Sequence, residues 1–259
     1  MAELLASPAL LDVQGVSVHF GGIQALGQVS LQVDPGEAVG LVGPNGAGKT
    51  TLFDCISGRR RPDAGTVRFD GAPLDGLPAH RRAKLGIART FQRIEVFPEL
   101  TVREHLFVAE RARRGDGALW KDLLNMGMPR SDELERVDAV AGLVGLTDLL
   151  DVPVAALGLG MCRLVELGRA LACEPRLLLA DEPSSGLDFQ ETEALAGVLR
   201  TLQRDRGMAV LLVEHDLQMV ASTVDRVVVI DLGRIIAEGP FDRVIADPQV
   251  RHAYLGRPA

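Results

Sequence analysis

The sequence predicts an α/β fold in which a parallel sheet is wound between helices. Three apolar runs, 177–180, 209–213 and 227–230, are continuous, as expected for parallel strands that are covered on both faces. Helical segments separate these runs, notably over 191–206 and 217–222, so strands and helices alternate along the last third of the chain. The alternation favours a wound sheet over an all-helical or all-strand domain.

The middle third of the chain is predicted to be a helical insertion. Helical spacing covers 102–114 and 132–144, and a third helix is expected over 161–173. The stretch 115–129 is rich in glycine and methionine and indicates a loop. Residues 240–256 suggest two short terminal helices.

The first third begins with strand-like runs. These runs cover 11–20, 29–33 and 38–42, and turn signals at 21–22 and 34–36 separate them. A further short strand is expected at residues 66 to 70. We therefore predict an N-terminal antiparallel β subdomain ahead of the wound sheet.

Composition excludes several classes of function. The net charge of −7 argues against a nucleic-acid-binding face, which needs clustered lysine and arginine. The apolar runs are far shorter than the roughly 20 residues that span a bilayer, and Glu3 stands where a secretory signal carries positive charge. Cys55, Cys162 and Cys173 have no metal-ligand spacing, which favours a reduced cytosolic setting.

A complete phosphate-binding motif follows the run at 38–42. The segment GPNGAGKT matches G-x-x-x-x-G-K-[ST], and residues 49–57 read as a helix ended by Gly58. Glycines let successive backbone N–H groups converge on phosphate oxygens, and the helix N-terminus adds positive potential. Lys49 is expected to reach the outer phosphates and the Thr50 hydroxyl to ligate Mg²⁺. The residues predicted to hold ATP here are Gly43, Pro44, Asn45, Gly46, Ala47, Gly48, Lys49, Thr50 and Thr51.

Two acids follow the apolar run at 177–180. Asp181 and Glu182 stand at the carboxyl end of this strand, where wound sheets place their sites. We expect Asp181 to hold Mg²⁺ through water and Glu182 to polarise the attacking water, because phosphoryl transfer depends mainly on positioning and charge neutralisation.

With these motifs the sequence resembles the nucleotide-binding subunits of ABC transporters over nearly its whole length. In that family the glutamine of a segment such as ARTFQ, here Gln92, ligates Mg²⁺ and senses the attacking water. The histidine of VEHD, here His215, contacts the γ-phosphate, and Asp188 in SGLD belongs to a loop that crosses to the opposite subunit. Phe20 occupies the place of the aromatic residue that stacks on adenine, although a core position is an alternative.

The chain departs from the family in its signature segment. The usual L-S-G-G-Q becomes LGLGM at 157–161, so the serine that contacts the γ-phosphate of the opposite subunit is absent. Gly160 remains ahead of a helix whose N-terminal N–H groups can face a phosphate. The resemblance implies that Gly158, Gly160 and Met161 face ATP bound by a second subunit. A degenerate, inactive half-site is the alternative, and the effect on hydrolysis rate stays open.

The departure points to a subfamily. ATPase subunits of branched-chain (hydrophobic) amino-acid importers often lack this serine, and they carry stretches similar to FGG at 20–22, ARTFQ at 88–92, FPELTV at 97–102 and AYLG at 253–256. The longer of their two ATPase subunits is the more similar. Importers of urea or short amides look much the same, so they remain an alternative.

The resemblance implies one ABC ATPase domain over 8–259. Residues 8–92 and 157–259 would form the ATP-binding core with the β subdomain, and residues 93–156 the helical subdomain. The implied partners are ATP with Mg²⁺, a second ABC ATPase subunit of the same or another kind, transmembrane permease subunits docked near 92–100, and, indirectly, an extracytoplasmic solute-binding protein. No nucleic acid is expected. The protein would lie peripherally on the cytoplasmic face of the cell membrane.

Other classes of protein explain the sequence less well. A chromosome or repair ATPase would carry a long coiled coil, for which the helical segment is too short, and a GTPase would carry an N-K-x-D motif. A regulatory module without useful hydrolysis is favoured only by the altered signature segment. Cys162 beside that segment is read either as an oxidation-sensitive thiol or as a plain buried small residue.

Overall fold

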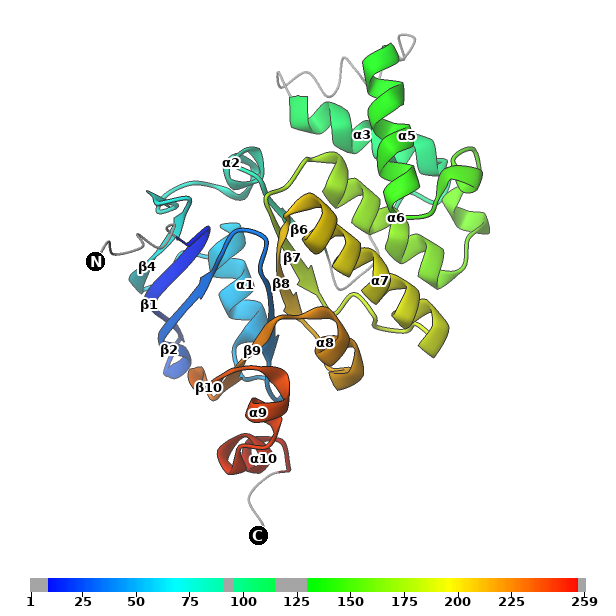
Figure 1. Ribbon diagram of the computed structural model, residues 1–259. Helices are drawn as coiled ribbons and strands as arrows, with labels where there is room; N and C mark the ends of the chain where they lie inside the picture. The colour runs from blue at the N-terminus through cyan, green and yellow to red at the C-terminus, as the bar shows by residue number, and fades with distance from the viewer. Residues whose placement is uncertain (1–8, 91–95, 115–129, 256–259) are drawn as a thin grey trace, which may run out of the picture.

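Two β-sheets organise the molecule in the computed structural model, which describes residues 9–90, 96–114 and 130–255. A six-stranded sheet has the order β10-β9-β3-β8-β7-β6, and a four-stranded sheet has the order β2-β1-β4-β5 (Figure 1). The strands are β1 (Leu11–Phe20), β2 (Ile23–Val33), β3 (Ala38–Val42), β4 (Ala64–Phe69), β5 (Ala72–Pro73), β6 (Ile87–Arg89), β7 (Leu177–Asp181), β8 (Ala209–Val213), β9 (Arg226–Asp231) and β10 (Arg234–Gly239).

The larger sheet is parallel except at one edge. Strands β9, β3, β8, β7 and β6 pair in parallel, and β10 joins β9 antiparallel. The helices are α1 (Lys49–Ser57), α2 (Ala79–Lys84), α3 (Val102–Arg114), α5 (Ser131–Leu143), α6 (Leu159–Ala172), α7 (Phe189–Arg206), α8 (Leu217–Thr223), α9 (Phe241–Ile245) and α10 (Pro248–Leu255), with short 3₁₀ turns at Thr147–Leu149 and Val154–Ala156. Within the described ranges, none of these helices is long and apolar enough to cross a membrane.

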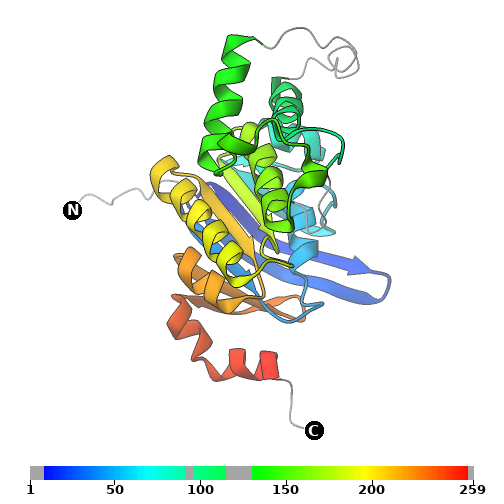
Figure 2. The ribbon, with the colours of Figure 1, turned by 90° about the vertical axis from the view of Figure 1, so that its right-hand side faces the viewer.

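Both faces of the parallel sheet are buried. Leu177 and Leu179 of β7 pack with Phe53 of α1 and with the small sheet. Leu178 and Ala180, which alternate with them, pack instead in the core that α6 and α7 share. Figure 2 shows α1 and α7 on opposite sides of the strands. The prediction of a wound α/β sheet with an antiparallel β subdomain is confirmed.

Several strands differ from the prediction. β2 starts at Ile23 rather than at residue 29, because the segment after the β1–β2 turn, in which polar and apolar residues are mixed, continues the ladder, with Phe20 opposite Ile23. β6 and β10 were not predicted. β6 spans only Ile87–Arg89, and β10 is a half-buried edge strand without a long apolar run.

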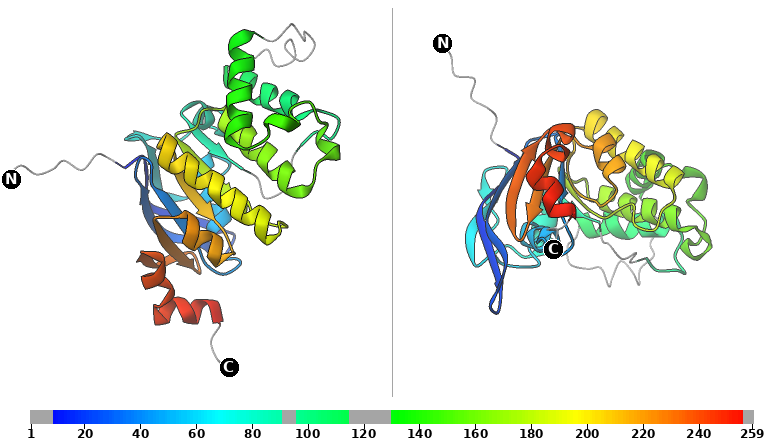
Figure 3. Two further views of the ribbon diagram at one scale, coloured as in Figure 1. Left: turned by 45° about the vertical axis from the view of Figure 1, so that its right-hand side comes forward. Right: turned by 90° about the horizontal axis from the view of Figure 1, so that it is seen from below.

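The helical segment forms a layer of its own. Leu106 of α3, Val137 of α5 and Val165 of α6 are buried together in the core on this side of the sheet. Both views of Figure 3 separate α3 and α5 from the small sheet. The division of the chain at 93–156 stays a prediction; α6, which begins at Leu159, packs on both α3 and α5.

Candidate active site

The phosphate loop connects the end of β3 to the start of α1. Gly43 has φ 152°, and an added Cβ would lie 2.0 Å from the carbonyl oxygen of Ile230, so a side chain has no room there. Gly48 has φ 109°, and its Cβ would lie 2.6 Å from the Ala25 oxygen. Among the described residues no side chain caps the N-terminus of α1, and its first turn holds no acid. The free N–H groups of this helix therefore favour an anion.

Lys49 lies inside the loop. Its side chain is almost fully buried, and Nζ donates to the carbonyl oxygens of Gly43 at 2.6 Å and Pro44 at 2.9 Å. Burial lowers the pKa of the ammonium group, and the charges of Glu182 and Asp181 oppose that shift. The loop thus carries a desolvated cation beside the two predicted acids. Thr50, next in the chain, is exposed, and Thr51 is half-buried.

Asp181 ends β7 and is held by an arginine. Arg89 of the neighbouring strand β6 donates from Nη2 to Asp181 Oδ2 at 2.8 Å and from Nη1 to Asp54 Oδ1 at 2.6 Å. The side chains of Arg89 and Asp181 are 8% and 6% exposed. Arg89 was not predicted to take part in the site. The available signal was its position in a short strand, directly after the apolar residues Ile87 and Ala88.

Glu182 and His215 meet at the carboxyl ends of β7 and β8. The Nε2 atom of His215 lies 2.9 Å from Glu182 Oε1, although the two residues are far apart in the chain. Glu182 has a φ of 47°, which is unusual for a residue with a side chain, and its amide donates to the Val213 carbonyl at 2.8 Å. Unusual backbone angles of this kind cluster at functional sites, where the surrounding structure enforces them.

Glu214 ties the two loops of the site together and was missed as a functional residue. Its buried carboxylate accepts hydrogen bonds from the backbone amides of Ser184 and His215, both at 2.8 Å. It therefore fixes the loop after β7 against the loop after β8, where Glu182 and His215 meet. An acid directly after a buried strand was the available signal, as it was for Asp181.

The signature segment and the loop around Asp188 form one surface. Gly158 is the N-cap of α6, Gly160 is buried, and an added Cβ at Gly160 would lie 2.4 Å from Glu191 Oε1. Asp188 caps α7 by accepting a hydrogen bond from the Glu191 amide at 2.8 Å. Met161 is half-buried. A side chain at position 160 would therefore have to displace the Glu191 carboxylate, which accepts a hydrogen bond from the Asp188 amide.

Cys162 lies beside this surface. Burial raises the pKa of its thiol, with Glu166 adding to the shift. A raised pKa lowers the thiolate fraction and with it the reactivity. The structure thus favours the small-residue interpretation of Cys162 over the oxidation-sensitive one.

Phe20 stands at the tip of the β1–β2 hairpin. Its side chain is 50% exposed, which argues against the alternative that it belongs to the core. The guanidinium carbon of Arg60 lies 3.8 Å from the ring centroid, and Nη2 donates to the His19 carbonyl at 2.9 Å. The ring is thus accessible, and Arg60 is positioned to hold it. Gln92 lies outside the described residues.

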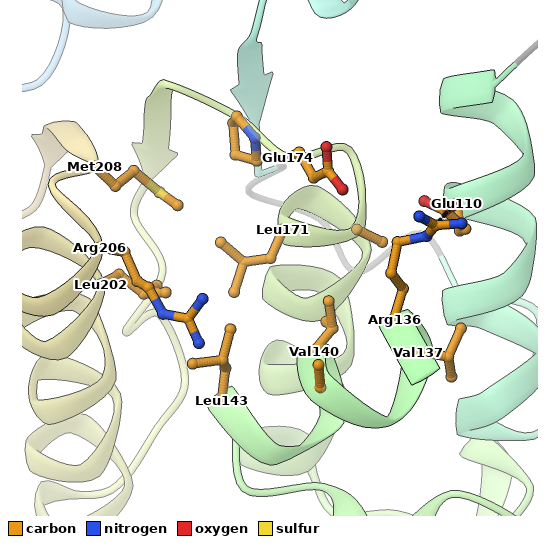
Figure 4. Close-up of a pocket in the computed structure, with 13 residues that line it drawn as sticks. Glu110, Arg136, Val137, Val140, Leu143, Leu171, Glu174, Leu202, Arg206 and Met208 are labelled. Carbon is orange, nitrogen blue, oxygen red and sulfur yellow. Dashed lines mark ion pairs between the residues drawn. The ribbon is translucent and has the colours of Figure 1, made fainter. Parts of the chain in front are cut away.

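The cavity in Figure 4 lies elsewhere. It has a volume of about 360 Å³ between α5, α6 and α7, and Arg136 forms an ion pair there with buried Glu110 at 2.7 Å. Its lining includes none of the predicted site residues. It lies between the helical layer of α3, α5 and α6 on one side and α7 on the other.

A phosphate loop, a strand-end acid pair and a histidine on a wound sheet define a P-loop ATPase. A family model described as "ABC transporter" matches residues 26–185, and one described as "Branched-chain amino acid ATP-binding cassette transporter" matches residues 234–259. The chain belongs to the ATP-binding subunits of ABC transporters and is an ATPase.

Individual relatives and a solved structure match this chain over nearly its whole length. The chain is 37% identical to the high-affinity branched-chain amino acid transport ATP-binding protein BraF of Pseudomonas aeruginosa, over 96% of this chain and 99% of the relative. It is 36% identical to LivG of Escherichia coli, a protein with the same description, over 96% and 99%. The ATP-binding cassette MJ1267 in its ADP conformation has a TM-score of 0.85 and 31% identity, over 96% of this chain and 99% of that one.

The exposed Phe20 ring leads to a prediction for nucleotide affinity. Because a base stacked on an aromatic ring gains about 1–3 kcal/mol, we expect Phe20→Ala to weaken ATP binding at least about fivefold. Inorganic triphosphate should bind as before, since it has no base to stack. The matched control is Ile23→Ala, which removes an exposed apolar side chain opposite Phe20. Equal ATP affinity in wild type and Phe20→Ala would remove the stacking role.

Proposed function

We propose that this chain powers the uptake of branched-chain and other hydrophobic amino acids as the ATP-hydrolysing subunit of an ABC importer. The observation that carries the proposal is the Glu182–His215 pair beside the phosphate loop, in a chain whose full length aligns with amino-acid transport ATPases. The match of residues 234–259 to a branched-chain amino acid family model supports the same solute class. The relatives' names favour this class over the urea or amide alternative.

The residues beside the loop fit Mg²⁺. The exposed hydroxyl of Thr50 and the carboxylate of Asp181 are oxygen donors, which Mg²⁺ prefers, and this ion usually keeps several waters and binds partly through phosphates. In the part of the chain that the structure describes, no cluster of three or more histidine, cysteine or acidic residues forms a dedicated metal cage, which suits such an ion. The cation would neutralise phosphate charge, and Gln92 is the further predicted ligand.

The roles of the remaining residues follow from their positions. Lys49 would leave the carbonyls of Gly43 and Pro44 and bind the outer phosphates of ATP. Glu182 would orient and polarise the attacking water, and His215, held 2.9 Å from that carboxylate, would contact the γ-phosphate. The site would thus position water and phosphate without a covalent intermediate.

A second ATPase subunit would complete the site. α1, which follows the phosphate loop, packs on one face of the sheet, whereas α6, which carries the signature segment, packs on the other. One chain therefore does not readily bring both segments to one nucleotide. Leu159 and Phe189 beside the signature surface are 44% and 70% exposed and offer apolar contacts to the opposite subunit. The signature residues Gly158, Gly160 and Met161, and Asp188, would then face the partner's ATP.

The membrane subunits would dock at a second cavity. This cavity of about 390 Å³ lies between β6 and α3, and Ala88, Ala109 and Ala112 are among its lining residues. Its lining joins these small side chains to charged ones such as Arg59 and Glu166, which would offer a partner both apolar and polar contacts, and it borders Thr90, from which the chain enters the segment of Gln92. Docking here would link the membrane subunits to the ATP site, at the cytoplasmic face of the membrane.

The experiment is solute uptake by the assembled transporter. Proteoliposomes would hold this chain with its permease subunits, ATP inside and the solute-binding protein outside. We expect ATP-dependent uptake of leucine, isoleucine and valine but not of urea or acetamide, and no uptake with Glu182→Gln. Uptake of urea in place of the amino acids would overturn the solute class. ATP-independent uptake would overturn the role of the chain.

A further inference from the structure

The tip of the β1–β2 hairpin carries Phe20 and stands clear of the elements around it. Phe20 pairs with Ile23 across a two-residue turn, and among the described residues an added Cβ at Gly21 or Gly22 would meet no atom within 4 Å. Figure 2 shows this hairpin extending beyond the other elements. Ordering a side chain on binding costs free energy, so a ring that is already held binds a base more tightly than one that is not.

Arg60 holds the ring from the segment that follows α1. Its guanidinium carbon lies 3.8 Å from the centroid of the Phe20 ring, well inside the range of a cation–π contact, so it covers one face of the ring. Because the Phe20 side chain is still 50% exposed, the other face is open to a base. The same guanidinium donates from Nη2 to the carbonyl of His19 at 2.9 Å. Arg60 therefore contacts both the ring and the backbone directly before it.

The same segment fixes the hairpin at further points. Asp63 Oδ2 accepts a hydrogen bond from the His19 amide at 2.6 Å and lies 3.2 Å from His19 Nδ1. The Asp63 amide donates to the Ser17 carbonyl at 2.8 Å, and the Arg60 amide donates to the Asp54 carbonyl of α1 at 3.0 Å. α1, which begins at the phosphate loop, therefore leads directly into the residues that hold the hairpin tip.

We propose that Arg60 is a positioning residue for the adenine base, which stacks on one face of Phe20 and holds the ring so that the base can stack on the other. The inference rests on the proposed role of Phe20 in ATP binding and adds a second residue to it. Arg60 acts through the ring and not on the phosphates. Its loss therefore weakens the binding of nucleotides and leaves the hydrolytic step intact.

The test is Arg60→Met in the full-length chain, measured by titration with ATP and by ATPase kinetics. We expect the Kd and the KM for ATP to rise about two- to fivefold, which is the effect of losing one cation–π contact at an exposed site. The kcat should stay within about twofold of wild type, because binding that is equal in substrate and transition state affects KM alone. Inorganic triphosphate should bind as before. The matched control is Arg61→Met, the same change at the exposed neighbouring position.

A double variant shows whether Arg60 acts through the ring. In Phe20→Ala combined with Arg60→Met, the Kd for ATP should equal that of Phe20→Ala alone, because the arginine then has no ring to hold. Losses that add in the double variant, or weaker binding of triphosphate by Arg60→Met, would show that Arg60 contacts the nucleotide itself and would overturn the proposal.

The single variants separate this inference from the role of Phe20. ATP affinity that is unchanged in Arg60→Met but weaker in Phe20→Ala would overturn the role of Arg60 and leave the stacking in place. A lower melting temperature of Arg60→Met at constant Kd would likewise show a merely structural contact. Equal affinities in wild type and Phe20→Ala would instead remove the stacking on which the inference rests. These measurements use ATP and triphosphate alone, so they are independent of the transported solute.

Discussion

Replacing Glu182 by glutamine should reduce ATP turnover about 100- to 10,000-fold, which is the usual contribution of a positioned acid–base group. The amide keeps the shape of the side chain but is a far weaker base, so the attacking water loses its polarising partner. ATP binding should persist, because Lys49 and the N-terminus of α1 are unchanged. Steady-state ATPase rates and ATP titration together separate the two effects.

The control for this variant is Glu193→Gln on the exposed face of α7. It makes the same chemical change away from the site and should leave turnover unaltered. Turnover in Glu182→Gln close to that of wild type would contradict the assigned role. Equal losses of binding and turnover would mean that the substitution disturbs the loop rather than the chemistry.

Replacing Arg89 by alanine should destabilise the fold by about 3–5 kcal/mol, since removing one partner of a buried ion pair leaves an uncompensated charge. The uncompensated charge would be the carboxylate of Asp181, whose side chain is only 6% exposed. Asp54 would lose the same partner. Denaturant unfolding measures this loss. Adding Asp181→Asn should recover part of the stability, because it removes the charge that Arg89 compensates.

Arg176 offers the matched control. It pairs with Asp70 at 2.6 Å, but the two side chains are 50% and 56% exposed, so solvent screens the interaction. Arg176→Ala should therefore cost far less than Arg89→Ala. Similar losses in the two variants would show that the Arg89 pair is no more than a surface contact.

The parts of the site that lie at strand ends were predictable. β3, β7 and β8 are short and fully buried, so continuous apolar runs in the sequence identify them. A predicted site follows each run: the phosphate loop after β3, the acid pair at the end of β7 and His215 after β8. Parallel strands bring their carboxyl ends to one edge, which is why Glu182 and His215 meet. Phe20 is exposed at the β1–β2 turn, which is compatible with the predicted stacking of its ring on adenine.

The parts that depend on partners from distant segments were not predictable. Arg89 matters because β6 lies beside β7, and Glu214 because its carboxylate reaches the amide of Ser184. The local patterns mark Arg89 and Glu214 as polar residues beside buried strands, but they do not identify the distant partners. Gln92 stays a prediction, as do the roles of the signature residues.

ATP-driven association of the Glu182→Gln variant shows whether two subunits complete each ATP site, as proposed. Light scattering would follow its molar mass with Mg²⁺ and ATP, alone and mixed with the companion ATPase of the same transporter. We predict that the mass doubles in at least one of these conditions and that Lys49→Ala stays monomeric. A Glu182→Gln variant that binds ATP yet remains monomeric in both conditions would mean that the ATP site needs no second subunit.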